Sequence, residues 1–120
     1  MTAARMLAVA VDCHQPDLLA EFWAAAIGGG KTRKWTDSHG TEYRQVDFES
    51  GPALLFQPVP EGKAGKNRLH LDLAPVERDQ RAEVERLVML GAKVLEDPAD
   101  DPWVVLADPE GNEFCVLPPR

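Results

Sequence analysis

The chain has 120 residues, of which 44% are hydrophobic and 28% charged, a globular composition that excludes a disordered, collagen-like or coiled-coil protein. Its 20 acidic and 13 basic residues give a net charge of −7, which repels phosphate backbones and anionic headgroups, so we expect no nucleic-acid or membrane partner. No apolar stretch reaches the roughly 20 residues of a membrane span, and no signal-peptide pattern begins the chain. We therefore expect a cytoplasmic protein whose two cysteines, Cys13 and Cys115, are reduced.

The predicted elements follow one another twice in the same order: a strand, a helix and three more strands. The first helix starts at Pro16, whose missing N–H suits the first helical position, and ends at Gly28; the second ends at Gly91. Asp108-Pro109-Glu110-Gly111 is typical of a hairpin turn. The predicted strands cover residues 7–11, 31–36, 41–48 and 53–57 in the first half, and 69–73, 93–96, 103–107 and 113–117 in the second.

The repeat predicts an α+β protein made of two tandem βαβββ modules within a single domain, residues 1–120. Module 1 covers about residues 5–60, a linker about residues 58–67, and module 2 about residues 68–119. Two curved mixed sheets of this kind are expected to enclose one small-molecule cavity.

Side chains alternate between the two faces of a strand, so apolar alternate positions are expected to pack on the helices and their neighbours to line the cavity. The predicted helix-facing positions are Leu7, Val9, Val11, Leu54, Phe56, Leu69, Leu71, Leu73, Phe114 and Val116. The predicted cavity-facing positions are Met6, Ala8, Ala10, Asp12, Leu55, Gln57, Arg68, His70, Asp72, Cys115 and Leu117. The second, third, sixth and seventh strands do not alternate cleanly, and their faces stay open.

Three runs of sequence resemble one known family. They are Leu54-Leu55-Phe56-Gln57, Lys66-Asn67-Arg68-Leu69-His70-Leu71-Asp72-Leu73 and Asp108-Pro109-Glu110-Gly111-Asn112-Glu113-Phe114. Together with the repeat, they are similar to the vicinal oxygen chelate superfamily, and within it to bacterial glyoxalase-like and bleomycin-resistance-like proteins. The resemblance implies the glyoxalase/bleomycin resistance/dioxygenase fold, a small-molecule ligand and a homodimer.

The resemblance also implies where metal ligands would stand. Family members with glyoxalase activity hold a metal with two His and two Glu, and these positions fall here on Ala8, Gln57, His70 and Cys115. Ala8 has no donor atom and Gln57 offers only a neutral amide oxygen, whereas a catalytic zinc ion usually needs three competent ligands. We therefore expect no cofactor; zinc or nickel held with Cys115 in place of Glu is the alternative.

Three residues are the predicted catalytic set. His70 could act as general acid or base, and Gln57 could orient a substrate oxygen by hydrogen bonding. Cys115 could be a nucleophile if a nearby cation lowered its pKa, or a soft metal ligand. The structural alternatives are a histidine paired with Asp72 or a carbonyl, an ordinary polar glutamine and an apolar filler cysteine.

Four residues are the predicted ligand-binding set. Arg68 and Asp72 could tune the charge of His70 or bind a carboxylate, and a structural ion pair is their alternative. Trp35 and Trp103 could form an aromatic wall for a planar ligand, with core or dimer packing as the alternative.

The resemblance, taken with these residues, implies a lyase or isomerase-type enzyme acting on a small carbonyl-containing or cyclic metabolite without the usual metal quartet. The second hypothesis is an antibiotic-binding protein that sequesters its ligand without catalysis, and the negative charge would then favour a cationic ligand. The third is a metal-dependent lactoylglutathione lyase.

Overall fold

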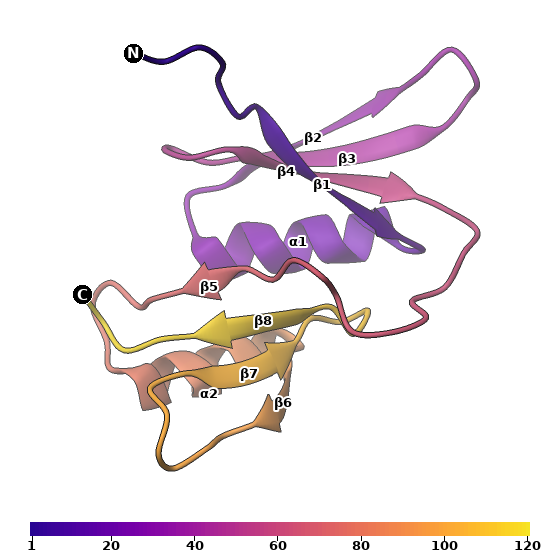
Figure 1. Ribbon diagram of the computed structural model, residues 1–120. Coiled ribbons are helices and arrows are strands. Elements are labelled where there is room, and N and C mark those ends of the chain that lie inside the picture. Colours follow the sequence, from indigo (N-terminus) through magenta and orange to yellow (C-terminus); the bar gives the residue numbers. More distant parts are fainter. The chain divides into compact units, whose positions relative to one another are not determined.

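Each half of the chain builds a four-stranded mixed sheet whose first strand pairs in parallel with its last (Figure 1). The computed structural model describes residues 1–120, which divide into two compact units, Met1–Gly62 and Lys63–Arg120. The boundary lies within the predicted linker. The predicted α+β class and the two βαβββ modules are confirmed, while a single cavity enclosed by both sheets stays a prediction.

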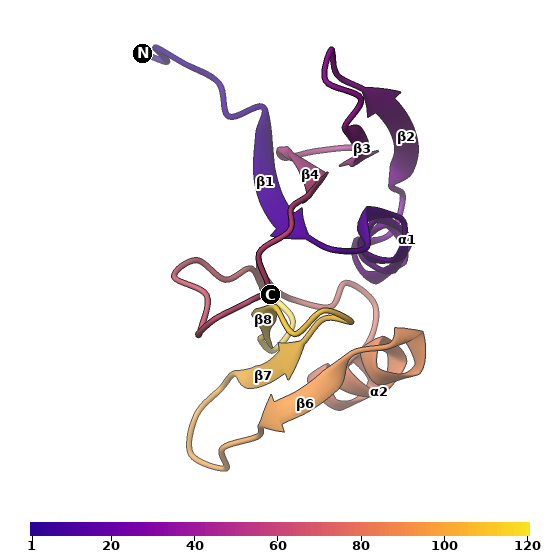
Figure 2. The same cartoon turned by 90° about the vertical axis from the view of Figure 1, so that its right-hand side faces the viewer.

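Unit 1 has one helix on one face of its sheet (Figures 1 and 2). Its strand order is β1-β4-β3-β2. Its elements are β1 (Ala8–Cys13), α1 (Pro16–Ile27), β2 (Lys31–Thr36), β3 (Glu42–Asp47) and β4 (Ala53–Pro58).

The helix α1 begins at Pro16 and ends where Gly28 adopts a positive φ of 87° and donates its N–H to the carbonyl oxygen of Ala24. Both ends agree with the sequence prediction. Its buried apolar side chains, Phe22 and Trp23 among them, pack against β2, β3 and β4.

The sheet supplies the other half of the unit 1 core. Val46, Leu54 and Phe56 are buried, as period-two alternation predicts for the last two. Leu7, predicted to pack on the helix, precedes β1 and is 69% exposed, so that prediction is wrong. A β-carbon on Gly30 would lie 2.7 Å from the side chain of Val46, so this close approach of the chain to the core requires glycine.

Unit 2 repeats this construction, with strand order β5-β8-β7-β6. Its helix contacts β6 and β8. Its elements are β5 (Asp72–Leu73), α2 (Gln80–Leu90), β6 (Lys93–Glu96), β7 (Val104–Ala107) and β8 (Glu113–Val116).

The first strand of unit 2 is shorter than predicted. The sequence suggests a strand over residues 69–73, but β5 contains only Asp72 and Leu73. Leu69 lies before the strand with 83% of its surface exposed, so its predicted packing on the helices is wrong. The predicted packing of Phe114 and Val116 in β8 is confirmed, because both are buried.

The hairpin between β7 and β8 depends on the buried carboxylate of Asp108. It accepts hydrogen bonds from the backbone N–H groups of Glu110 and Asn112 and from the Asn112 side-chain amide. Gly111 has a positive φ of 90°, as the predicted turn requires. Trp103, predicted to lie in a strand, precedes β7 and is 39% exposed.

The helix α2 buries a charged residue alongside its apolar ones. Asp79 caps the helix by accepting a hydrogen bond from the N–H of Ala82. Glu83 is only 4% exposed, and its carboxylate accepts hydrogen bonds from Arg86 and Arg78. These contacts, above all the one with Arg86, hold the pKa of Glu83 below its ordinary value. Neither helix of the chain is long and apolar enough to cross a membrane.

Replacement of Glu83 by Gln is expected to lower the free energy of unfolding by about 1–3 kcal/mol, because charge-assisted hydrogen bonds to both arginines are lost. The folded-state pKa of Glu83 is lowered, so its contribution is complete above the unfolded-state pKa and is lost as the pH falls through the folded-state pKa. Urea denaturation at neutral and acidic pH measures both effects.

The matched control is Glu85→Gln, a change at an exposed position of the same helix, which should alter stability by less than about 0.5 kcal/mol. Equal stabilities of the two variants at neutral pH would contradict a stabilising role for the buried carboxylate.

Candidate functional site

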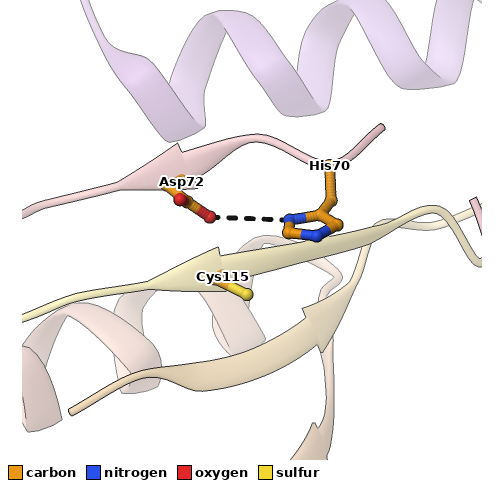
Figure 3. Close-up of side chains that lie close together, drawn as sticks. All are labelled: His70, Asp72 and Cys115. Carbon is orange, nitrogen blue, oxygen red and sulfur yellow. Dashed lines mark ion pairs between the residues drawn. The ribbon is translucent and has the colours of Figure 1, made fainter. Parts of the chain in front are cut away.

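Three polar side chains meet on the face of the unit 2 sheet that points away from α2. Asp72 of β5 and Cys115 of β8 are direct partners in the parallel pairing. Since Phe114 and Val116 are buried beside Cys115 in the strand, the thiol projects from the opposite face. His70 lies two residues before Asp72, and Figure 3 shows its ring beside the Asp72 carboxylate and the Cys115 sulfur.

The three side chains are close but differ in exposure. The Nδ1 atom of His70 is 3.6 Å from Oδ1 of Asp72, and the two side chains are 43% and 55% exposed. The ligand-capable atoms of His70, Asp72 and Cys115 all lie within 4.8 Å of one another. Sequence alternation predicts that these residues share a face, and the structure brings them together as one cluster.

The environment of Cys115 favours the thiol over the thiolate. Partial burial raises the pKa of Cys115, and the Asp72 carboxylate raises it further through its charge and a hydrogen bond. Lys66 acts weakly in the opposite direction. A nucleophilic cysteine needs a lowered pKa, so the surroundings do not favour that predicted role of Cys115.

The segment that carries His70 is tied to the sheet by Glu113. Its carboxylate accepts hydrogen bonds from the backbone N–H of Asn67 at 3.0 Å and from Lys63 Nζ at 3.1 Å. These partners hold the pKa of Glu113 below its ordinary value. Closer to the site, the N–H of Cys115 donates to the carbonyl oxygen of Leu71 at 2.9 Å.

Unit 1 carries an aromatic pair on the face of its sheet away from α1. Trp35 and Tyr43 are direct partners between β2 and β3, and their rings stack with centroids 4.3 Å apart and an interplanar angle of 17°. Arg44 instead forms an ion pair with Asp17 of α1, so its neighbour Tyr43 faces the other way. Gln57 alternates with the buried Phe56 and shares the face with Tyr43.

Asp37 organises the β2–β3 hairpin and contacts Tyr43 of the aromatic pair. Its carboxylate accepts hydrogen bonds from the N–H groups of Thr41 and His39 and from the hydroxyl of Tyr43. The Thr41 N–H contributes most to a lowered pKa of Asp37. The hydrogen bond to Asp37 in turn raises the pKa of Tyr43.

The predicted ligand-binding residues do not gather in one place. Arg68 is exposed in the segment before β5. The carboxylate of Asp72 in β5 lies next to His70. Trp103 lies in unit 2, whereas Trp35 lies in unit 1 with Tyr43, a partner that the sequence analysis missed. The turn residues around Gly40 are the sequence signal that could have identified Tyr43 as the partner of Trp35. A hairpin turn determines which residues of its two strands are paired.

An open groove of about 810 Å³ lies elsewhere in unit 1, at the N-terminal end of α1. Asp17, Lys34 and Arg44 are among its lining residues, and no predicted site residue is.

The residues at the family metal positions do not make the His and Glu set. Ala8 of β1 and Gln57 of β4 lie on the unit 1 face away from α1 and provide no imidazole or carboxylate. His70 alone retains a usual ligand type, and Cys115 occupies the remaining position. We therefore derive no reaction step through the metal of that quartet.

Residues 8–117 match the family described as "Glyoxalase-like domain". The chain belongs to the glyoxalase-like domain family. This agrees with the predicted resemblance to the vicinal oxygen chelate superfamily. A comparison with curated proteins found no match.

Solved structures show the same fold at low sequence identity. The fosfomycin resistance protein FosX from Listeria monocytogenes matches with a TM-score of 0.75 and 9% identity, over 100% of this chain and 96% of that one. TnmS3, an antibiotic binding protein from a Streptomyces species, matches with a TM-score of 0.66 and 20% identity, over 100% and 99%. The trypanothione-dependent glyoxalase I of Leishmania major has a TM-score of 0.66 and 16% identity, over 96% and 86%.

The Asp37→Asn variant is expected to lower the pKa of Tyr43 toward its ordinary value near 10, because the protonated phenol loses a charged acceptor. Tyr43 is the single tyrosine of the chain, so ultraviolet absorbance titration reports on it alone. Asp47→Asn, which removes a carboxylate from the strand that carries Tyr43, is the control and should leave the Tyr43 pKa unchanged. A Tyr43 pKa unchanged by Asp37→Asn would contradict the role of this hydrogen bond.

Proposed function

We propose that this glyoxalase-like protein is a lyase or isomerase-type enzyme in which His70 moves a proton on a small carbonyl-containing or cyclic metabolite. The observation that supports it is the accessible His70 imidazole with Nδ1 3.6 Å from the Asp72 carboxylate. A small rotation of either exposed side chain brings these atoms within hydrogen-bond distance. The carboxylate then orients the ring, and the second ring nitrogen stays available to a substrate.

The proposed step is proton transfer at the carbon next to a carbonyl group. An imidazole nitrogen of His70 accepts the proton, and the C–H electron pair moves toward the carbonyl oxygen to form an enolate. The imidazolium then returns its proton to the same carbon or a neighbouring one, so atoms and electrons balance without an oxidant or reductant. The protonated thiol of Cys115 can donate a weak hydrogen bond to the substrate in this step.

Gln57 belongs to the proposal as a second, separable element. An amide N–H on its side chain is suited to orient a substrate oxygen. Gln57 lies in unit 1, and the role of His70 does not depend on it.

The proposed activity can be tested before the natural substrate is known. Small hydroxy- and keto-carbonyl compounds incubated with the protein in D₂O should exchange the proton beside the carbonyl for deuterium, as followed by NMR. His70→Gln should slow exchange by about 100-fold or more, the usual contribution of a general acid or base. Asp72→Asn should slow it less, because the base itself remains.

The matched control is His39→Gln, a change at an exposed histidine in the β2–β3 turn that should leave the exchange rate unchanged. Circular dichroism checks that each variant is folded. Equal exchange rates for His70→Gln and the unaltered protein would contradict the proposal.

Ligand sequestration without catalysis is the second candidate function, and the stacked Trp35–Tyr43 pair favours it. Trp35 is 38% exposed, and an accessible aromatic surface can stack on a planar ligand. TnmS3, which has the same fold, is described as an antibiotic binding protein. The net charge of −7 would favour a cationic ligand.

For a planar cationic antibiotic, Trp35→Ala should weaken binding by about tenfold, the loss expected for one stacking contact. Equilibrium dialysis measures the affinity, and mass spectrometry of the recovered ligand shows whether it is altered. Leu95→Ala, a change at an exposed apolar residue of β6, is the control and should leave the affinity unchanged. Equal affinities for Trp35→Ala and the unaltered protein would contradict the stacking role, and recovery of an altered ligand would contradict pure sequestration.

A further inference from the structure

His70 lies in a stretch of chain that is not held by packing of its own side chains. Residues 68–70 are all exposed, and Leu69 has 83% of its surface exposed. The stretch precedes β5, and the strand pairing with β8 starts only at Asp72. The position of the His70 imidazole therefore depends on how the two ends of this stretch are attached.

Both ends are attached to the same strand, β8. After His70, the carbonyl oxygen of Leu71 accepts a hydrogen bond from the N–H of Cys115 at 2.9 Å. Before His70, the N–H of Asn67 donates to the carboxylate of Glu113 at 3.0 Å. The two attachment points stand two residues apart in β8, and His70 lies between the two residues that they hold.

The Glu113 carboxylate is the larger of these two attachments. Its side chain is only 15% exposed, and it also accepts a hydrogen bond from Lys63 Nζ at 3.1 Å. The Lys63 ammonium donates in addition to the carbonyl oxygen of Gly65 in the same segment. Hydrogen bonds to an ionised carboxylate are stronger than those between neutral groups. One side chain of β8 thus holds the chain before His70 at two residues, Lys63 and Asn67.

The side chain of Asn67 makes a further contact with the hairpin between β7 and β8. Its amide donates to Oδ1 of Asn112 at 3.2 Å. Asn112 is itself fixed, because its own side-chain amide donates to the buried Asp108 carboxylate at 3.0 Å. Asn67 is therefore held through its backbone by Glu113 and through its side chain by the turn.

We propose that Glu113 is a positioning residue for the reaction of His70, because its carboxylate fixes the chain so that the imidazole stays beside Asp72. This inference rests on the proposed function. Glu113 acts through the backbone of Asn67, three residues before the histidine. A displacement of a reacting group by about 1 Å can cost on the order of 100-fold in rate. Loss of this attachment therefore lowers turnover although the base itself is unchanged.

The kinetic test compares Glu113→Ala with Glu113→Gln in the deuterium-exchange assay, using the small hydroxy- or keto-carbonyl probe on which the unaltered protein is most active. Glu113→Ala removes the acceptor of both hydrogen bonds and should lower kcat by about tenfold or more, with KM changed by less than about twofold. Glu113→Gln keeps an oxygen that can accept from Asn67 and should retain more of the activity. Glu85→Gln, at an exposed position of α2, is the matched control and should leave both constants unchanged.

The position of the ring is measured independently of activity. The nuclear Overhauser cross-peak between the ring protons of His70 and the β-protons of Cys115 reports the proximity that Figure 3 shows. This cross-peak should weaken in Glu113→Ala and keep its intensity in Glu85→Gln. Circular dichroism checks that each variant is folded. If Glu113→Ala does not fold, Glu113→Gln and Lys63→Gln are compared with the control in both measurements.

The two measurements separate this inference from the proposed function. A full cross-peak in the folded variants that lack the Glu113 contacts would overturn the positioning role, and so would an unchanged kcat in an active protein. A weakened cross-peak together with a lowered kcat would support it. A cross-peak that weakens in a protein without exchange activity on any probe would support the attachment of His70 by Glu113 and contradict the proposed function.

Discussion

The architecture depends on one constraint: each four-stranded sheet has a single helix of its own unit to cover it. Alternate strand residues must therefore be apolar on the helix side, as Phe56 is in unit 1 and Phe114 in unit 2. The strand residues between them point to the opposite face and need not be apolar. The residues able to do chemistry follow this division, since Gln57 and Cys115 each stand directly beside a buried core residue.

The two units use this freedom differently. Along the parallel pairing of unit 1, the face away from α1 carries Ala10 opposite Leu55, and Asp12 opposite Gln57. No imidazole or thiol stands there. The corresponding face of unit 2 places Asp72 opposite Cys115, with His70 beside them. The same backbone arrangement thus carries a cluster of His, Asp and Cys side chains in one unit and not in the other. The identity of the residues, and not the backbone arrangement, therefore determines whether such a cluster forms.

Most of the fold was predictable because its strong signals are local. A proline at the start and a glycine at the end delimit α1, and the turn chemistry of Asp108 to Gly111 delimits the last hairpin. The faces of β2 and β6 were not predictable, since every residue in both strands is exposed and no apolar alternation exists to read. Leu69 continues the alternation of Leu71 and Leu73, yet the sheet does not extend to it. The stack of Trp35 on Tyr43 required the strand register, which is not a local property.

The short length of β5 has a consequence for how this site can open. Its two residues provide little sheet hydrogen bonding. The preceding chain is held by the contacts of Glu113 with Asn67 and Lys63, by a hydrogen bond from the Asn67 amide to Asn112, and by the Cys115 N–H donated to the Leu71 carbonyl oxygen. Local opening therefore disrupts few interactions and costs much less than global unfolding. Such a fluctuation would carry His70 away from Cys115 while β8 stays in its sheet. His70 lies outside the paired strands that carry Asp72 and Cys115. Its position therefore depends on the local stability of this segment more than on the global stability of the fold.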